Sequence, residues 1–186
     1  MPAQTAATPY SSLLYLFQVL ASVASTPVVL LDIDSALVEA AVKGIAADLE
    51  KLVSKKRMEE ATATAALGRI TGSSDYASLK DCDLIIEVVS ERMEIKDKVL
   101  KSIDAVAKDG AIIASNTSSI SITKLAAVCP GRAKQFVGMH FFNPVPAMKL
   151  VEIIKGLETA DEAADAVFVL AEKMGKVSLA SSRAAV

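Results

Sequence analysis

Apolar residues are distributed along this chain in two different patterns. Continuous runs of mostly branched apolar residues occur in 27–34 (PVVLLDID), 83–89 (DLIIEVV) and 111–115 (AIIAS), as expected for strands buried on both faces of a parallel sheet. Between these runs, apolar residues recur every three or four positions, which predicts helices in 35–56 and 91–110. Strands that alternate with helices predict an α/β fold with helices on both faces of a mostly parallel sheet.

Predicted helices and strands also alternate in the second half of the chain. Residues 121–131 predict a short helix that ends at a proline and a glycine, and residues 161–176 predict a final helix. The runs QFVGMHF (135–141) and MKLVEII (148–154) predict two further strands. Parallel sheets of this kind bind ligands outside the carboxyl ends of their strands, so we expect the functional residues at the strand ends.

The first 26 residues contain an apolar run but no lysine, arginine, aspartate or glutamate. They have neither the positive start of a secretory signal nor the roughly 20 continuous apolar residues of a membrane helix. Helical spacing predicts a buried helix here instead, at Leu13, Leu14, Phe17, Leu20 and Ala21. We expect an irregular segment over 1–10, one domain over 11–180 and a disordered tail over 181–186.

Composition narrows the function classes. Lysine and arginine total 20 against 22 acidic residues, so there is no basic field that would favour nucleic acid. Cys82 and Cys129 are far apart and match no metal-binding spacing, which predicts buried thiols, a reducing compartment and no metal site. We therefore expect a cytoplasmic protein that binds neither nucleic acid nor membrane.

Asp32 closes the first strand-like run. In dinucleotide-binding sheets an acid at such a strand end accepts hydrogen bonds from the adenosine ribose and disfavours a 2′-phosphate, which predicts NAD rather than NADP. In the alternative interpretation, Asp32 and Asp34 only start a turn and cap the next helix through Ser35. Spacing alone leaves both interpretations open.

Two polar clusters follow the next strand ends. Glu91 and Lys96 come after DLIIEVV, where they could contact a nicotinamide ribose or serve as ordinary charges in the first turns of a helix. The segment SNTSS (115–119) follows AIIA, and its five small polar residues exceed what capping of the next helix requires. They could also present hydroxyls and an amide to a ligand.

His140 is the only histidine of the chain. It stands near the end of one predicted strand, and Pro144 and Pro146 then prevent the chain from continuing in the sheet. Glu152 interrupts the next strand, where a carboxylate would be costly unless paired or solvated. Adjacent strands could bring this acid against the imidazole, and such a pair makes an effective general base near neutral pH.

The segments SNTSSISIT and GMHFFNPVPAMKLVEII together resemble the signature region of the L-3-hydroxyacyl-CoA dehydrogenases, and the similarity extends over roughly 18–177. It implies a Rossmann-like, doubly wound NAD-binding domain that oxidises L-3-hydroxyacyl-CoA to 3-oxoacyl-CoA in fatty acid β-oxidation. By this resemblance His140 would take the proton of the 3-hydroxyl and Glu152 would support it. Ser118 would bind the substrate oxygen.

The same resemblance implies the cofactor and CoA contacts. Asp32 would bind the adenosine ribose, Asn116 would lie by the cofactor or reacting group, and Glu91 with Lys96 would lie beside the nicotinamide half. The stretch LEKLVSKKRMEEATATAALGRI resembles the helical arm of the family, along which CoA is expected to lie. Its basic side chains are candidate phosphate ligands, although a solvated helix end also explains them: Lys55, Lys56 and Arg57.

The chain departs from the family pattern at both ends. There is no glycine before Gly44, and alignment places the three positions of the GxGxxG turn at Thr8, Tyr10 and Leu13. We therefore expect the first strand and the glycine-rich turn to be missing, and the C-terminal helical domain to be absent. This leaves two interpretations: an active dehydrogenase, as a homodimer or with a partner chain that supplies the helical domain, or a weak relative that only binds CoA or nucleotide. A third class, the 3-hydroxyisobutyrate or 6-phosphogluconate type of dehydrogenase, is disfavoured by HFFNPVP and Glu152.

Overall fold

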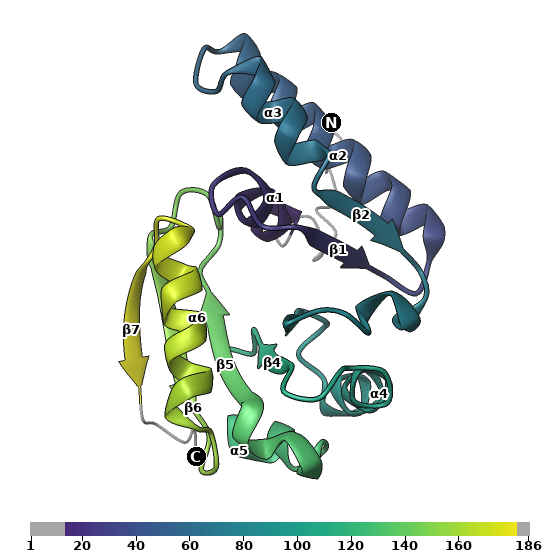
Figure 1. The fold of residues 1–186 in the computed structure, drawn as a ribbon, viewed down its shortest axis with the longest axis vertical. Coiled ribbons are helices and arrows are strands. Elements are labelled where there is room, and N and C mark those ends of the chain that lie inside the picture. Colours follow the sequence, from purple (N-terminus) through teal and green to yellow (C-terminus); the bar gives the residue numbers. More distant parts are fainter. Residues whose placement is uncertain (1–13, 182–186) are drawn as a thin grey trace, which may run out of the picture.

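Two separate sheets organise the chain, in a computed structural model that describes residues 14–181 (Figure 1). The smaller sheet pairs β1 (Val28–Leu31) with β2 (Ile70–Ser73) in parallel. The larger sheet has the order β3-β4-β5-β6-β7, and its only antiparallel pair is β5 with β6. Its strands are β3 (Leu84–Glu87), β4 (Ile112–Ser115), β5 (Phe136–Phe141), β6 (Leu150–Lys155) and β7 (Val177–Ser181).

The α/β class and the mostly parallel pairing predicted from the sequence are confirmed. Among the described residues, no hydrogen-bonded ladder joins β1 to β3, so the strands form two sheets. The expected disordered tail begins too early, since β7 includes Ser181 and pairs with β6 through that residue. The remaining residues of that tail, and the expected irregular segment over 1–10, lie outside the described part of the chain.

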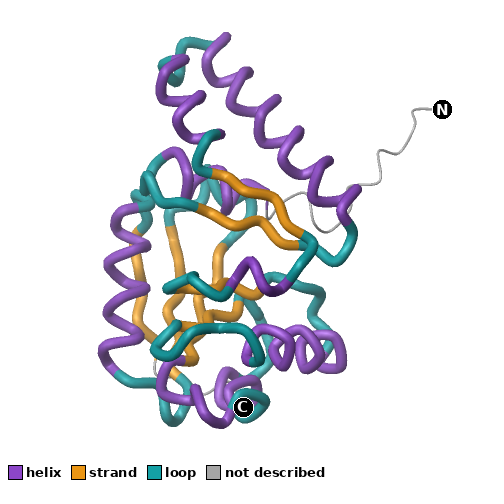
Figure 2. The backbone as a smooth tube through the Cα atoms, turned by 45° about the vertical axis from the view of Figure 1, so that its right-hand side comes forward, coloured by secondary structure: helices purple, strands orange, loops and turns teal. Residues whose placement is uncertain are grey.

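Helices lie on both sides of the strands (Figure 2). One face is covered by α1 (Leu14–Ser22) and α6 (Asp161–Lys173), whose buried residues join those of both sheets in one apolar core. The opposite face carries a second core, built by α4 (Met93–Asp104) and α5 (Ile122–Ala126) with the 3-10 segments η1 (Tyr76–Leu79) and η2 (Pro130–Gln135). No described helix is both long and apolar enough to cross a membrane.

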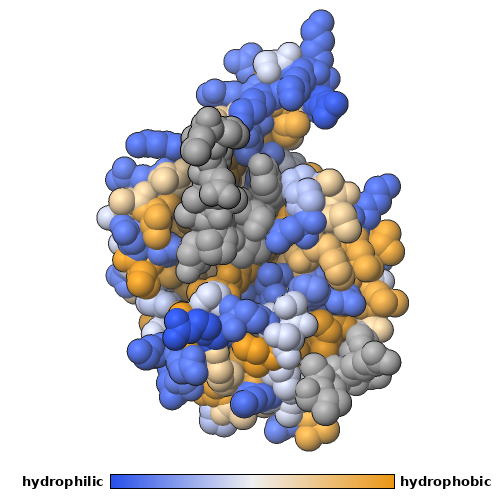
Figure 3. Space-filling view, turned by 180° about the vertical axis from the view of Figure 1, so that it is seen from behind, coloured by the Kyte–Doolittle hydropathy of each residue, from blue (hydrophilic) through white to orange (hydrophobic). Residues whose placement is uncertain are grey.

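A helical hairpin projects from the smaller sheet. It consists of α2 (Ser35–Ser54) and α3 (Glu60–Leu67), which contact each other and extend beyond the body of the protein (Figure 1). Buried residues of α2 recur at positions 38, 41, 45 and 49, so one stripe of the helix packs inward. The end of the hairpin is covered by hydrophilic residues (Figure 3), which fits the exposure of Lys55 and Lys56.

Candidate active site

His140 and Glu152 meet through the pairing of β5 and β6. The two residues are direct partners in the antiparallel register, so their side chains leave the same face of the sheet next to each other. His140 Nδ1 lies 2.8 Å from Glu152 Oε2, and the two side chains are 18% and 34% exposed. A carboxylate at this distance favours the tautomer with the proton on Nδ1, which leaves Nε2 as the proton-accepting nitrogen.

Local packing explains which face His140 occupies. Side chains alternate along a strand, so His140 shares its face with Phe136 and Gly138, on the α5 side. Gly138 lies so close to α5 that an added Cβ would meet Ile122 at 2.8 Å. Phe142 supports the imidazole from the following turn, with ring centroids 4.7 Å apart.

The turn after β5 is held by a residue that sequence reasoning did not select. Lys176, which is 8% exposed, donates to the backbone oxygens of Val145 and Met148, the latter at 2.7 Å. Burial lowers the pKa of its ammonium group. Pro144 begins this turn after a cis peptide bond, and its carbonyl accepts from the amides of residues 147 and 148. The signal in the sequence was a lone lysine before the VSLAS run, which is too weak to interpret.

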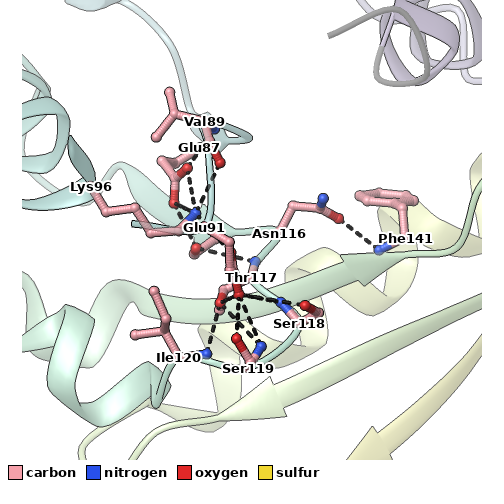
Figure 4. Close-up of polar contacts among 11 residues, drawn as sticks. Glu87, Val89, Glu91, Lys96, Asn116, Thr117, Ser118, Ser119, Ile120 and Phe141 are labelled. Carbon is pink, nitrogen blue, oxygen red and sulfur yellow. Dashed lines mark hydrogen bonds and ion pairs between the residues drawn. The ribbon is translucent and has the colours of Figure 1, made fainter. Parts of the chain in front are cut away.

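The SNTSS loop is organised by Glu91. One carboxylate oxygen accepts from the Thr117 hydroxyl, from the amides of Ser118 and Ser119 at 3.0 Å each, and from the Ser119 hydroxyl at 3.0 Å (Figure 4). Burial raises the pKa of this carboxyl, but the hydrogen bonds from Thr117 and Ser119 and the charge of Lys96 lower it by more, to about 2. Glu91 therefore carries a negative charge at neutral pH and keeps the loop in one conformation.

Lys96 lies in the interior, and its side chain is only 1% exposed. Its ammonium group contacts both carboxylate oxygens of Glu87 at 2.9 and 3.0 Å, the Val89 carbonyl at 3.3 Å and Glu91 at 3.5 Å (Figure 4). The expectation that Lys96 is either a surface charge or a direct cofactor contact does not fit this burial. Its contacts make it the support of Glu91.

Glu87 is the second residue that sequence reasoning missed. Its side chain is fully buried, and besides Lys96 it accepts from the Ser115 hydroxyl at 2.7 Å and from the Val89 amide at 2.7 Å. An unpaired charge on Glu87 or on Lys96 would be destabilising in this interior. The stability of the ion pair therefore depends on all of the hydrogen bonds that the two side chains make. The glutamate within the apolar run LIIEVV was the available signal.

Asn116 connects the loop to the strand that carries His140. The side-chain Oδ1 of Asn116 accepts from the backbone amide of Phe141 at 2.8 Å, and the backbone amide of Asn116 donates to the backbone carbonyl of Glu87 at 2.9 Å (Figure 4). The structure thus brings SNTSS beside the end of β5. Ser118 is exposed in this loop.

Asp32 stands at the end of β1, beside the cleft between the two sheets. Its Oδ1 accepts from the Asp34 amide at 3.2 Å, while Asp34 caps α2 through the Ala36 amide at 2.8 Å. The capping role therefore belongs to Asp34, and Asp32 keeps a partly exposed carboxylate at the strand end. Lys55, Lys56 and Arg57 lie at the end of α2, on the projecting hairpin. Within residues 14–181, no three His, Cys, Asp or Glu side chains are arranged to hold a metal ion.

Comparison with known proteins gives these contacts a family context. Residues 16–184 match the model of the 3-hydroxyacyl-CoA dehydrogenase NAD-binding domain. A probable 3-hydroxybutyryl-CoA dehydrogenase of Deinococcus radiodurans is 47% identical over 131 residues, which are 70% of this chain and 46% of the relative. A 3-hydroxybutyryl-CoA dehydrogenase of Bradyrhizobium diazoefficiens is 43% identical over 156 residues, or 84% of this chain and 53% of the relative.

A solved structure agrees with these matches. The crystal structure of (S)-3-hydroxybutyryl-CoA dehydrogenase PaaH1 from Ralstonia eutropha superposes with a TM-score of 0.87 at 45% identity, covering 95% of this chain and 62% of that one. The chain spans about half the length of the curated dehydrogenases that it matches. It belongs to the 3-hydroxyacyl-CoA dehydrogenase family, and its matched region is the NAD-binding domain of that family.

Proposed function

We propose that this chain contributes the NAD-binding and proton-transfer part of a 3-hydroxyacyl-CoA dehydrogenase, which oxidises L-3-hydroxyacyl-CoA to 3-oxoacyl-CoA. The observation that carries the proposal is the 2.8 Å contact between His140 Nδ1 and Glu152 Oε2, beside the SNTSS loop. The imidazole is partly exposed, so a substrate can reach its other nitrogen.

His140 is the general base in this proposal. Its Nε2 takes the proton of the substrate 3-hydroxyl, and the Glu152 carboxylate stabilises the imidazolium that results. The Ser118 hydroxyl, on the exposed side of the loop, donates to the same substrate oxygen. The loop does not need to reorganise during the reaction, because Glu91 already holds its amides and hydroxyls.

NAD, when bound, supplies the acceptor for the hydride that leaves C3 of the substrate. Two described features fit this cofactor: the partly exposed Asp32 carboxylate at the end of β1 can accept from ribose hydroxyls, and Asn116 lies between the loop and β5. Glu91 faces the same strand ends, with Lys96 behind it. The three positions aligned with the glycine-rich turn lie outside the described residues.

The CoA part of the substrate is assigned to the projecting hairpin. Lys55 and Lys56 are exposed at its end, where ammonium groups can approach phosphates without leaving water. Relatives named 3-hydroxybutyryl-CoA dehydrogenase and, in Acinetobacter baylyi, fatty acid oxidation complex subunit alpha support an acyl-CoA as the substrate class.

The test is a fluorescence titration of the purified chain with NADH, followed by acetoacetyl-CoA to look for oxidation of the NADH. Removal of a general base lowers turnover by roughly 10²–10⁴-fold, which is the loss expected for His140→Gln. Glu172→Gln, an exposed substitution on α6, is the matched control and should leave turnover unchanged. Turnover that survived His140→Gln would show that the base is a different group.

A second candidate function is binding of CoA or nucleotide without turnover. The division of the strands into two sheets beside Asp32 favours this second function. A cofactor at the carboxyl ends of β1 and β3 would not rest on one continuous sheet. A chain that titrates with a CoA thioester but not with NADH would point to this function and against the dehydrogenase.

A further inference from the structure

The charged groups behind the SNTSS loop are unequal in number. Two acids, Glu87 and Glu91, share one base, and among the described residues Lys96 forms ion pairs only with these two. The sharing is also unequal in distance. The ammonium group contacts both oxygens of Glu87 at 2.9 and 3.0 Å, but the nearest oxygen of Glu91, Oε2, lies at 3.5 Å. Glu87 therefore takes up most of the charge of Lys96.

Glu91 uses its other oxygen, Oε1, for the SNTSS loop. This oxygen accepts from the Thr117 hydroxyl, from the amides of Ser118 and Ser119 at 3.0 Å each, and from the Ser119 hydroxyl. In Figure 4, Lys96 lies on one side of Glu91, and Ser118 and Ser119 lie on the other. The Glu91 side chain is 36% exposed and is free to move, whereas Lys96 is held by packing. The position of Oε1 therefore depends on how strongly Lys96 attracts this carboxylate.

Glu87 also contacts the loop directly, at its first two residues. Its Oε2 accepts from the Ser115 hydroxyl at 2.7 Å, and its backbone carbonyl accepts from the Asn116 amide at 2.9 Å. Its Oε1 accepts from the Val89 amide at 2.7 Å, which fixes the carboxylate at the end of β3. The start of the loop and the ammonium group are thus held by the same side chain.

We infer that Glu87 is a positioning residue for the proposed reaction. It binds Lys96 through both oxygens and so leaves Glu91 free to hold the SNTSS loop. The loop in turn fixes the Ser118 hydroxyl. Glu87 itself is fully buried and acts only through these groups. The inference rests on the proposed function for the role of Ser118, whereas the contacts among the charged groups do not depend on that function.

Loss of the negative charge of Glu87 would change this balance. A glutamine here has nearly the same shape and can still accept from the Ser115 hydroxyl, but it attracts an ammonium group much less than a carboxylate does. An ammonium group that lacks its partner in the interior is destabilised, so Lys96 would move closer to Glu91. That movement draws the carboxylate away from the loop amides. The Ser118 hydroxyl would then lose its fixed position.

The first measurement is hydrogen exchange in the free chain, followed by nuclear magnetic resonance at the amides of Ser118 and Ser119. Glu87→Gln should speed exchange at both amides by about tenfold or more, because their acceptor is drawn away. Addition of Lys96→Met removes the competing cation and should slow exchange again. Glu94→Gln, an exposed substitution in the first turn of α4, is the matched control and should have no effect.

The second measurement is turnover with acetoacetyl-CoA and NADH. Glu87→Gln should lower kcat by about tenfold or more, up to the roughly 10²–10³-fold cost of losing one fixed hydrogen-bond donor. In a Ser118→Ala background the same substitution should lower kcat by less than about threefold, because the hydroxyl that Glu87 positions is already gone. A residue that acted only through stability would lower kcat equally in both backgrounds.

A second variant keeps the test available if Glu87→Gln does not fold. Ser115→Ala removes one hydrogen bond to the same carboxylate and leaves every charge in place. It should speed exchange at the Ser118 and Ser119 amides by about twofold or more, because Glu87 is then less firmly held against Lys96.

Three results would overturn the inference. The first is unchanged exchange at both amides in the folded Glu87 or Ser115 variant. The second is exchange that stays fast when Lys96→Met is added, and the third is an equal loss of kcat with and without the Ser118 hydroxyl. Exchange is measured without substrate or cofactor. A wild-type chain without turnover would therefore refute the proposed dehydrogenase, and the exchange results would still decide the inference.

Discussion

The five-stranded half and the β1–β2 half of this molecule are held together by different interactions. The larger half contains the ion pair of Glu87 with Lys96, the cross-strand pair of His140 with Glu152, and most of the second core. The smaller half has two four-residue strands and depends on packing of α1, α2 and α3. Two-stranded sheets are marginal alone, so the smaller half depends more on the packing of its helices than on strand pairing.

Among the substitutions that test this difference between the two halves, Lys96→Met is expected to reduce stability most. Removal of one member of a buried pair leaves an uncompensated charge at Glu87, so the free energy of unfolding should fall by about 3–5 kcal/mol in urea titration. Adding Glu87→Gln should restore part of this loss. Lys101→Met removes an exposed pair with Asp97 and should cost only about 0–1 kcal/mol. A loss as small as the Lys101 control would refute the structural role of the pair.

Gly138→Ala should have the next largest effect. The new methyl group would approach Ile122 at 2.8 Å and Ile154 at 2.9 Å, and overpacking of this kind costs about 1–3 kcal/mol. Thermal unfolding monitored by circular dichroism measures the loss. Gly131→Ala, where nothing lies within 4 Å, should change stability by less than about 0.5 kcal/mol. Equal effects at both glycines would contradict the close contact between β5 and α5.

A smaller effect, confined to the β1–β2 half, is expected from Asp34→Ala. Loss of its cap on the Ala36 amide should destabilise α2 by about 1 kcal/mol. Hydrogen exchange should become faster in the first turn of α2 and in β1, while exchange in β5 and β6 stays unchanged. Glu39→Ala, an exposed change on the same helix, is the control. Faster exchange throughout β5 and β6 would show that the two halves unfold as one unit.

A further effect concerns the pH dependence of the SNTSS loop. The Glu91 pKa falls from 4.5 to about 2 on folding, so its contribution to stability is complete above pH 4.5 and is lost as pH falls towards 2. The difference in unfolding free energy between the wild type and Glu91→Gln should therefore be constant near neutral pH and shrink in that acidic window. A difference that grew on acidification would contradict the hydrogen bonds assigned to this carboxylate.

Much of the fold follows from the sequence because long periodic segments specify their own elements. The runs around residues 28–31, 84–87 and 112–115 became strands, since continuous branched apolar residues suit burial on both faces. β2 was missed because ITGS is short, contains glycine and has exposed residues at its centre. β7 was missed because VSLAS carries no distinct apolar pattern, although pairing with β6 makes it a strand.

The contact between His140 and Glu152 could be predicted from the sequence because it is a single interaction. The burial of Lys96 could not, because it depends on several partners together. Glu152 within a strand indicated a partner for His140, and the register places them opposite each other. The burial of Lys96 could not be read from helical spacing, because it depends on Glu87, the Val89 carbonyl and Glu91 together. Spacing describes one element at a time, whereas these partners come from a strand, a loop and a helix.

Lys176 sets a minimum length for any working fragment of this chain. Every residue to which we assign a role in the proposed reaction step, from Ser118 to Glu152, precedes α6. The ammonium group that secures the turn between β5 and β6 nevertheless comes after α6, immediately before β7. A fragment that ended with α6 would keep all of the groups to which we assign the reaction. It would lose the Lys176 ammonium group, which fixes the turn between β5 and β6.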